Sequence, residues 1–135
     1  MVSESFPLPT EPEGVVPSLI ERLNSGKVSA LIEMFDPKCV FVEDDGRTVT
    51  GHADIAVRLE RFVKPGVPLV TKMRHVFVAD DIAQLVYDWW IDGTGRDGKE
   101  MHLKGTACDI VRRGADGRWR FMIDNNQGTA VRKPA

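Results

Sequence analysis

Four Asp-Gly pairs divide the second half of the sequence, and part of the first, into strand-like segments, and they constrain the fold more than any other feature. They stand at residues 45–46, 92–93, 97–98 and 116–117. Asp-Gly is typical of tight β-hairpin turns, because glycine and aspartate tolerate the backbone conformation that such turns require. The flanking segments are rich in β-branched and aromatic residues, and we expect strands at residues 39–44, 47–50, 70–79, 82–92, 99–113 and 118–126.

Three helices are predicted ahead of the main run of strands. Apolar residues recur at helical spacing from Val15 to Leu23, with Arg22 on the polar face. A short second helix carries apolar positions from Val28 to Phe35, and a third follows Gly51. Helices first and strands later favour an α+β fold over a wound parallel sheet.

The length of 135 residues fits one domain, which we place at residues 13–130. Residues 1–12 hold three prolines among polar residues and are predicted to form a flexible leader. No apolar run approaches the ~20 residues of a membrane span, and the N-terminus does not resemble a signal peptide. A net charge of −2 argues against nucleic-acid binding. Two cysteines without metal or redox spacing indicate reduced thiols in a cytoplasmic protein.

Alternation along residues 99–113 draws attention to one carboxyl group. Successive strand residues face opposite sides, so Asp109 shares a face with Leu103, Gly105, Ala107 and Val111. If this is the inner face, burial raises the pKa of Asp109, and a neutral carboxylic acid can donate a hydrogen bond to a developing oxyanion. The alternative is a structural aspartate paired with a backbone amide or an arginine.

Two other polar residues are weaker candidates. Asp44 ends a predicted strand and is either a general base at the mouth of a cavity or a solvated turn residue. His75 has the alternation of an inner face, which suits a pocket residue or a hydrogen-bonded core histidine. The three histidines show no metal-ligand spacing, so no metal site is predicted.

Trp89 and Trp90 are adjacent on one strand, so one indole faces inward and the other outward. Because large apolar groups seldom stay exposed on a sheet, the outward Trp90 predicts a covered surface and a homodimer.

Several stretches together resemble the nuclear transport factor 2-like superfamily, in its ketosteroid isomerase and SnoaL-like branch. They are Arg22 to Gly26, Ala30 to Phe35 with Val40 to Gly46, Gly51, Gly105 to Arg113, and Asp116 to Asn125. This resemblance implies a cone-shaped barrel, in which a curved antiparallel sheet wraps round three N-terminal helices. It also implies a deep apolar pocket and a homodimer.

The resemblance further implies roles for individual residues. Asp44 falls on the proton-shuttling base of ketosteroid isomerases, and Asp109 falls on their protonated oxyanion-hole acid. Ketosteroid isomerase is a standard example of an enzyme that combines a carboxylate base with a neutral carboxylic acid. Tyr87 and Trp89 fall on pocket-lining positions, whereas Leu19 stands where the family has its oxyanion-hole tyrosine. Phe121 and Ile123 are expected in the pocket wall, with Asn125 and His75 as further polar candidates.

Two functions therefore remain open, and a third is less favoured. The first is a cofactor-free isomerase, cyclase or lyase that uses Asp44 and Asp109 on a small apolar or polycyclic carbonyl compound. The second is a non-catalytic domain that binds a small ligand in the same pocket, since one fold serves catalysts and binders alike. The third is a protein-interaction module that uses the outer sheet face around Trp90.

Overall fold

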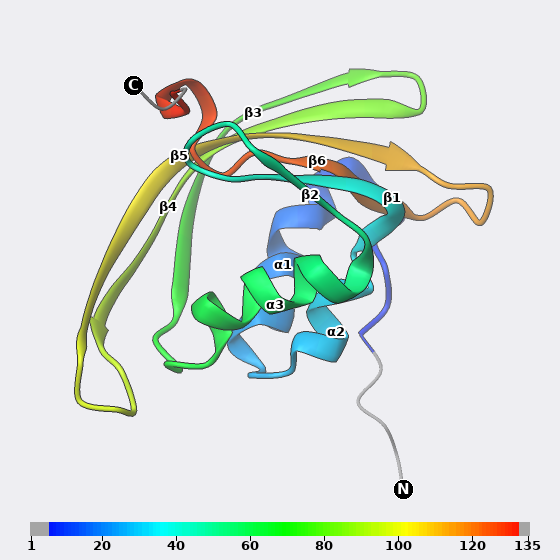
Figure 1. The fold of residues 1–135 in the computed structure, drawn as a ribbon. Helices are drawn as coiled ribbons and strands as arrows, with labels where there is room; N and C mark the ends of the chain where they lie inside the picture. The colour runs from blue at the N-terminus through cyan, green and yellow to red at the C-terminus, as the bar shows by residue number, and fades with distance from the viewer. Residues whose placement is uncertain (1–5, 133–135) are drawn as a thin grey trace, which may run out of the picture.

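The computed structural model describes residues 6–132, which form three helices packed against one curved six-stranded sheet (Figure 1). The helices are α1 (Val15–Asn24), α2 (Val28–Ile32) and α3 (His52–Val63), with short 3₁₀ turns η1 (Pro12–Gly14) and η2 (Gly128–Ala130) near the two ends. The strands are β1 (Phe35–Val42), β2 (Thr48–Thr50), β3 (Leu69–Ala79), β4 (Ile82–Thr94), β5 (Glu100–Arg113) and β6 (Trp119–Asp124). The α+β class predicted from the sequence is confirmed.

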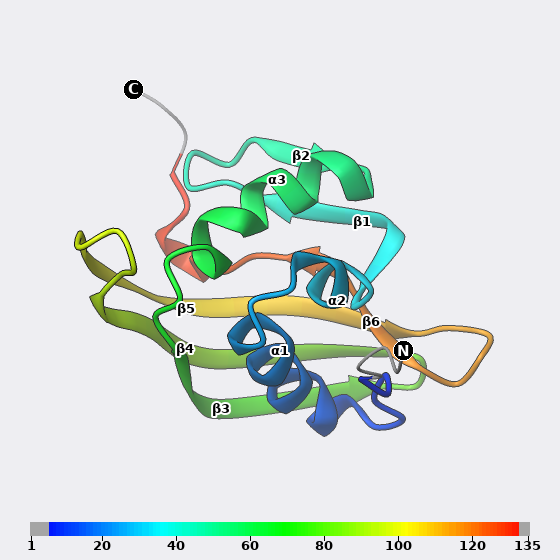
Figure 2. The same ribbon diagram turned by 90° about the horizontal axis from the view of Figure 1, so that it is seen from below.

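The sheet has the strand order β2-β1-β6-β5-β4-β3 and stays open at both edges. Strands β3 to β6 form an antiparallel meander, as expected, but β1 pairs with β6 in parallel, so the sheet is mixed. All three helices lie on its concave side (Figure 2). None of α1, α2 and α3 covers the convex, outer face of β3, β4 and β5 (Figure 1 and Figure 2).

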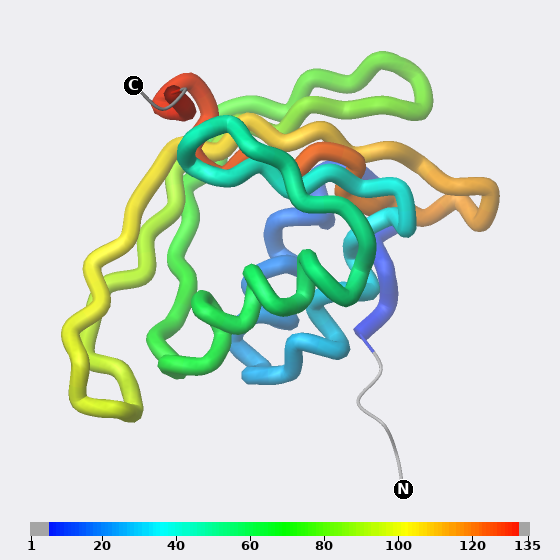
Figure 3. The backbone as a smooth tube through the Cα atoms, in the orientation of Figure 1, coloured from blue at the N-terminus to red at the C-terminus, as the bar shows by residue number. Residues whose placement is uncertain are grey.

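Three of the four Asp-Gly pairs form the predicted turns. Gly46, Gly98 and Gly117 have φ values of 87°, 80° and 77°, a region that favours glycine. The fourth pair is an exception, because Gly93 lies inside β4 and pairs with Met101 of β5. The remaining hairpin, between β3 and β4, turns at Asp80 with φ 58°. The hairpin loops project beyond the helices (Figure 3).

Two predictions near the N-terminus need correction. Phe35 does not end the second helix; it begins β1, where it pairs with Phe121 of β6. Arg22 does not lie on a solvated face, since its side chain is completely buried. The long-range pairing with β6 determines the position of Phe35, and a tertiary hydrogen-bond network determines that of Arg22. Neither interaction is visible in local periodicity.

The predicted leader contacts the domain throughout its described part. The backbone N–H of Trp119 donates to the carbonyl of Pro9 at 2.9 Å, and the Arg118 guanidinium donates to the carbonyl of Leu8 at 2.7 Å. Arg22 donates to the carbonyl of Phe6. Residues 6–12 therefore pack along α1 and β6, while residues 1–5 lie outside the described part of the chain.

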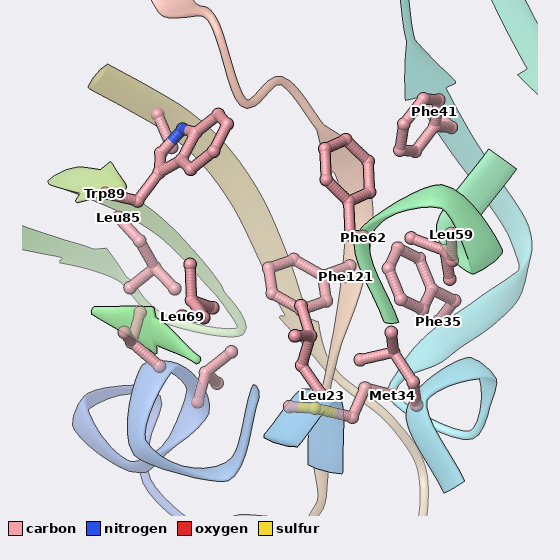
Figure 4. Close-up of a cluster of buried hydrophobic side chains, with 14 of the residues drawn as sticks. Leu23, Met34, Phe35, Phe41, Leu59, Phe62, Leu69, Leu85, Trp89 and Phe121 are labelled. Atoms are coloured by element: carbon pink, nitrogen blue, oxygen red, sulfur yellow. The ribbon is translucent and has the colours of Figure 1, made fainter. Parts of the chain in front are cut away.

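The core fills the space between the helices and the concave face of the sheet (Figure 4). The rings of Phe35 and Phe121 lie 5.1 Å apart, and Phe62 of α3 meets Trp89 of β4 edge to face at 6.2 Å. Leu85, Tyr87, Trp89 and Ile91 all point inward from β4, as its alternation predicts. Cys39 is buried and Cys108 half-buried, and both are free thiols.

Candidate functional site

The pairing of β4 with β5 brings an aspartate and the chain's single tyrosine together on the concave face of the sheet. Leu85 pairs with Asp109, and Tyr87 pairs with Ala107, in a register without irregularity. Asp109 has no solvent exposure. Asp109 therefore lies on the inner face of the sheet, a placement that its alternation alone left open.

Both carboxylate oxygens of Asp109 accept a hydrogen bond. The Tyr87 hydroxyl donates to Oδ2 at 2.6 Å, and the backbone N–H of Asn125 donates to Oδ1 at 2.8 Å. A buried polar group is costly unless it is paired, and these two donors meet that requirement.

A third group, Asp124, completes the cluster because of a β-bulge in β6. Phe121 pairs with Val111 and Ile123 pairs with Ile110, so Met122 is an extra residue on the β6 side of the ladder. Such an insertion reverses the alternation that follows it. As a result Ile123 turns outward with 41% of its surface exposed, while Asp124 turns inward and hydrogen-bonds Asp109.

The two carboxyl groups influence each other's titration. Burial raises the pKa of Asp109 from 3.8 to about 6, although hydrogen bonds from Tyr87, from the Asn125 backbone and from Asp124 hold it down. The pKa of Asp124 is raised well above its ordinary value, first by burial and then by the charge of Asp109 and their shared hydrogen bond. Both pKa values are raised, so the pair keeps a proton to a higher pH than two solvated aspartates would.

The neighbouring groups stay uncharged. Burial, followed by the Asp109 charge, raises the pKa of Tyr87 well above its ordinary value, so Tyr87 remains a hydrogen-bond donor. Burial and the nearby charges of Asp124 and Asp109 also raise the pKa of the Cys39 thiol. A neutral phenol and a neutral thiol thus border the aspartate pair.

An apolar pocket opens beside this pair, between the helices and the sheet. Its cavity volume is about 50 Å³. Most of its lining is aliphatic or aromatic, and its polar groups are Tyr87, Asp124 and Asn126. The complete lining is Leu19, Leu23, Leu31, Phe35, Phe41, Leu59, Phe62, Leu69, Tyr87, Trp89, Ile91, Asp124 and Asn126. A mostly apolar lining with a few polar groups is typical of small-molecule sites.

The structure brings some of the predicted site residues to this pocket. Leu19, Tyr87 and Trp89 line it, and Phe121 lies in the buried core that supports it. Asp109 is not in the lining, but it is hydrogen-bonded to two residues that are, Tyr87 and Asp124. Figure 4 shows Trp89 and Phe121 among the buried side chains around the pocket.

The other predicted residues lie elsewhere. Asp44 is exposed in the turn between β1 and β2, where its carbonyl accepts from the backbone N–H of Arg132. Ile123 faces outward because of the β6 bulge, and Asn125 is not in the pocket lining, although its backbone binds Asp109.

The inner-face position predicted for His75 from alternation is also wrong, and the reason is again a β-bulge. The ladder between β3 and β4 shifts between Met73 and His75, which makes Arg74 an extra residue on β3. His75 therefore lies on the outer face, exposed and stacked on Phe77 with ring centroids 5.1 Å apart.

Sequence reasoning missed Asp124 and Asn126, two of the three polar groups that line the pocket. Regular alternation from Trp119 and Phe121 points inward to Ile123 and Asn125, whereas the bulge moves both inward positions by one residue. The available signal was chemical: Asp124 is an acidic residue at the end of a mostly apolar strand.

The aspartate pair gives the stability an unusual pH dependence. Because the pKa of Asp109 is raised to about 6, the folded protein keeps a proton that the unfolded chain releases above its ordinary pKa of 3.8. Below pH 3.8 the shifted pKa of Asp109 contributes fully to the free energy of unfolding. This contribution is lost as the pH rises through about 6, a decrease on the order of 3 kcal/mol. The raised pKa of Asp124 extends the fall to higher pH.

We therefore expect Asp109→Asn to gain stability relative to the natural chain as the pH rises. Urea unfolding of both proteins between about pH 4 and pH 8 measures the difference in free energy of unfolding. A difference that stays constant over this range would contradict the titration described above.

The described residues contain no group of three or more His, Cys, Asp or Glu side chains placed to hold a metal ion. Within residues 6–132, no helix is long and apolar enough to cross a membrane. The arrangement places a hydrogen-bonded pair of carboxyl groups beside an apolar pocket.

Comparison with known proteins supports the fold. Residues 16–122 match the family model described as SnoaL-like domain. A comparison with curated proteins found no match.

Solved structures with the same fold come from several bacteria. A ketosteroid isomerase-like protein from Erwinia carotovora atroseptica shares 16% identity and a TM-score of 0.71, over 83% of this chain and 88% of that one. A conserved protein from Planctomyces limnophilus shares 20% identity and a TM-score of 0.74, over 85% and 91%. A nuclear transport factor 2-like superfamily protein from Salmonella enterica serovar Typhimurium shares 17% identity and a TM-score of 0.67, over 82% and 83%. These similarities establish the α+β cone expected from the sequence.

Proposed function

Because the chain belongs to the SnoaL-like domain family, we propose that it binds a small apolar carbonyl compound and transfers a proton on it without a cofactor. The observation that carries this proposal is the hydrogen-bonded pair of Asp109 and Asp124 at the polar end of the pocket. A fold shared by catalysts and binders does not decide function, so the proposal depends on this site.

The shape of the pocket determines how a ligand would lie. Its leucine, isoleucine and phenylalanine side chains would cover a small apolar body, and Trp89 would pack against it. The oxygen of the ligand would lie at the polar end, near Tyr87, Asp124 and Asn126. Asn126 carries the only side-chain amide in the lining, which makes it the candidate donor to a developing enolate oxygen.

The pair can act as a base although it already holds one proton. Asp124 would accept a proton from the carbon next to the carbonyl while its own proton passes to Asp109. The pair then holds two protons and no charge, and the substrate holds the negative charge as an enolate. Return of a proton from Asp124 to another carbon completes an isomerisation. The pKa of about 6 for Asp109 suits a base that works near neutral pH.

A non-catalytic binding domain is the second candidate, and a specific observation favours it. Asp44 is exposed outside the pocket, and Leu19 occupies the lining where the resemblance implies a tyrosine donor. The pocket therefore holds one acid–base pair instead of the separate base and oxyanion donors of the related isomerases.

Hydrogen–deuterium exchange distinguishes these two functions. A panel of enolisable ketones with apolar bodies is incubated with the protein in D₂O, and loss of the α-proton signal is followed by NMR. Binding is followed in parallel by the fluorescence of Trp89, which lines the pocket. Exchange supports an enzyme, whereas binding of panel members without exchange of any of them supports a binding domain.

We further propose that the outer face of the sheet packs against a second copy of the chain. Val70 and Trp90 pair side by side on this face with 43% and 38% of their surfaces exposed, and Phe77 and Ile123 extend the apolar area. The charge of Asp88 within the area is already paired with Arg74 at 2.9 Å. A second copy could therefore cover the face without leaving that charge unpaired.

This interface gives a direct prediction for Trp90→Glu. A charge placed at the centre of an apolar interface is expected to convert a dimer into a monomer, measured by light scattering during gel filtration. Val57→Glu is the matched control, since Val57 is exposed on α3, on the other side of the molecule. A natural chain that is already monomeric at high concentration would refute the interface.

A further inference from the structure

The donors around the aspartate pair are distributed unequally. Asp109 accepts from the Tyr87 hydroxyl through one oxygen and from the Asn125 backbone N–H through the other. Among the hydrogen bonds of the described residues, the Asp124 carboxyl has only the one that it shares with Asp109. Hydrogen bonds donated to a carboxylate stabilise its charged form.

We infer that Tyr87 is a positioning residue that fixes the shared proton on Asp124, the member of the pair that faces the pocket. By holding the negative charge on Asp109, Tyr87 leaves Asp124 as the group that carries the proton toward a ligand. The consequence for catalysis rests on the proposed function, whereas the location of the proton can be measured without any substrate.

The surroundings of Tyr87 favour this role over that of a ligand donor. Its single hydroxyl proton is committed to Asp109 at 2.6 Å, and its ring is buried in the core. The raised pKa of Tyr87 keeps that proton in place across the range in which the aspartates titrate.

Few other groups can disturb the pair. Asp109 of β5 and Asp124 of β6 face each other. Tyr87 of β4 contacts the pair, and the buried Cys39 thiol of β1 lies nearby. The helices contribute leucine and phenylalanine side chains to the adjacent pocket. Removal of one hydroxyl should therefore produce a clear change in titration.

The test is carboxyl NMR of the full chain labelled with ¹³C-aspartate, with Asp109→Asn and Asp124→Asn used for assignment. In the natural chain we expect Asp109 to titrate near its pKa of about 6 and Asp124 to stay protonated through neutral pH. In Tyr87→Phe we expect the Asp109 titration to move up by roughly one to two pH units, the size expected for losing a hydrogen bond to a charged group.

Trp89→Phe is a matched control for this measurement. It removes another 2.6 Å hydrogen bond from the same strand, donated by the indole to the carbonyl of Asn126, without touching either carboxyl. We expect the Asp109 titration to stay in place. If Tyr87→Phe leaves the titration unchanged as well, or shifts it no more than Trp89→Phe does, the inference is wrong.

A second measurement keeps the test open if Tyr87→Phe does not fold. Tyr87 is the chain's only tyrosine, so biosynthetic 3-fluorotyrosine changes this one hydroxyl alone. A more acidic phenol is a stronger donor, and we expect the Asp109 titration to move down. An unchanged titration would count against the role of Tyr87. If the titration shifts but the protein exchanges the α-proton of no ketone, Tyr87 is still the positioning residue of the pair and the proposed catalysis is rejected.

Discussion

Asp124→Asn is expected to lower the rate of α-proton exchange about 10²–10⁴-fold, the range typical of losing a positioned general acid or base. The variant keeps the shape of the side chain but cannot accept or release the proton. Ligand affinity should change little, because the apolar lining supplies most of the contact area. The exchange rate measured by NMR and the affinity measured by Trp89 fluorescence separate the two effects.

Asp54→Asn is the control for this variant, since Asp54 is an exposed aspartate on α3, and the exchange rate should be unchanged. Asp44→Asn tests the competing assignment given by family resemblance. If Asp44→Asn abolishes exchange while Asp124→Asn does not, the exposed aspartate of the β1–β2 turn is the base, and the pair described here has a structural role.

Arg22→Met is expected to destabilise the protein by about 3–5 kcal/mol, measured by urea unfolding. The Arg22 guanidinium is completely buried and donates to the carbonyls of Ala30 and Phe6, which would lose their partner. It also donates to Ser18 Oγ at 3.2 Å and to Glu33 Oε1 at 3.0 Å. One side chain thus ties the N-terminal segment, α1 and α2 together.

The matched control is Glu33→Gln, which changes the ion-pair partner and leaves the guanidinium in place. The Glu33 side chain is 62% exposed, and ion pairs with a solvated partner contribute about 0–1 kcal/mol. If Glu33→Gln costs as much as Arg22→Met, the stability comes from the ion pair and not from the two carbonyls.

Much of the fold was predictable from the sequence because its signals are local. Helical periodicity from Val15 to Leu23 and the Asp-Gly turns act over a few residues, and the observed α1 and hairpins agree with them. Along β4 and β5 the alternation is unbroken, so residue order alone grouped Tyr87 with Leu85 and Trp89 on one face. It likewise grouped Asp109 with Ala107 and Val111.

The composition of the site depends instead on where the ladder becomes irregular. The sequence by itself determined an α+β chain with an apolar inner face and one buried carboxyl on it. Only the tertiary structure decided that His75 faces solvent and that Asp124 joins Asp109, through extra residues at Arg74 and Met122. A bulge forms where a curved sheet must fit strands of unequal length to one another, and that fit depends on the partner strands as much as on the local residues.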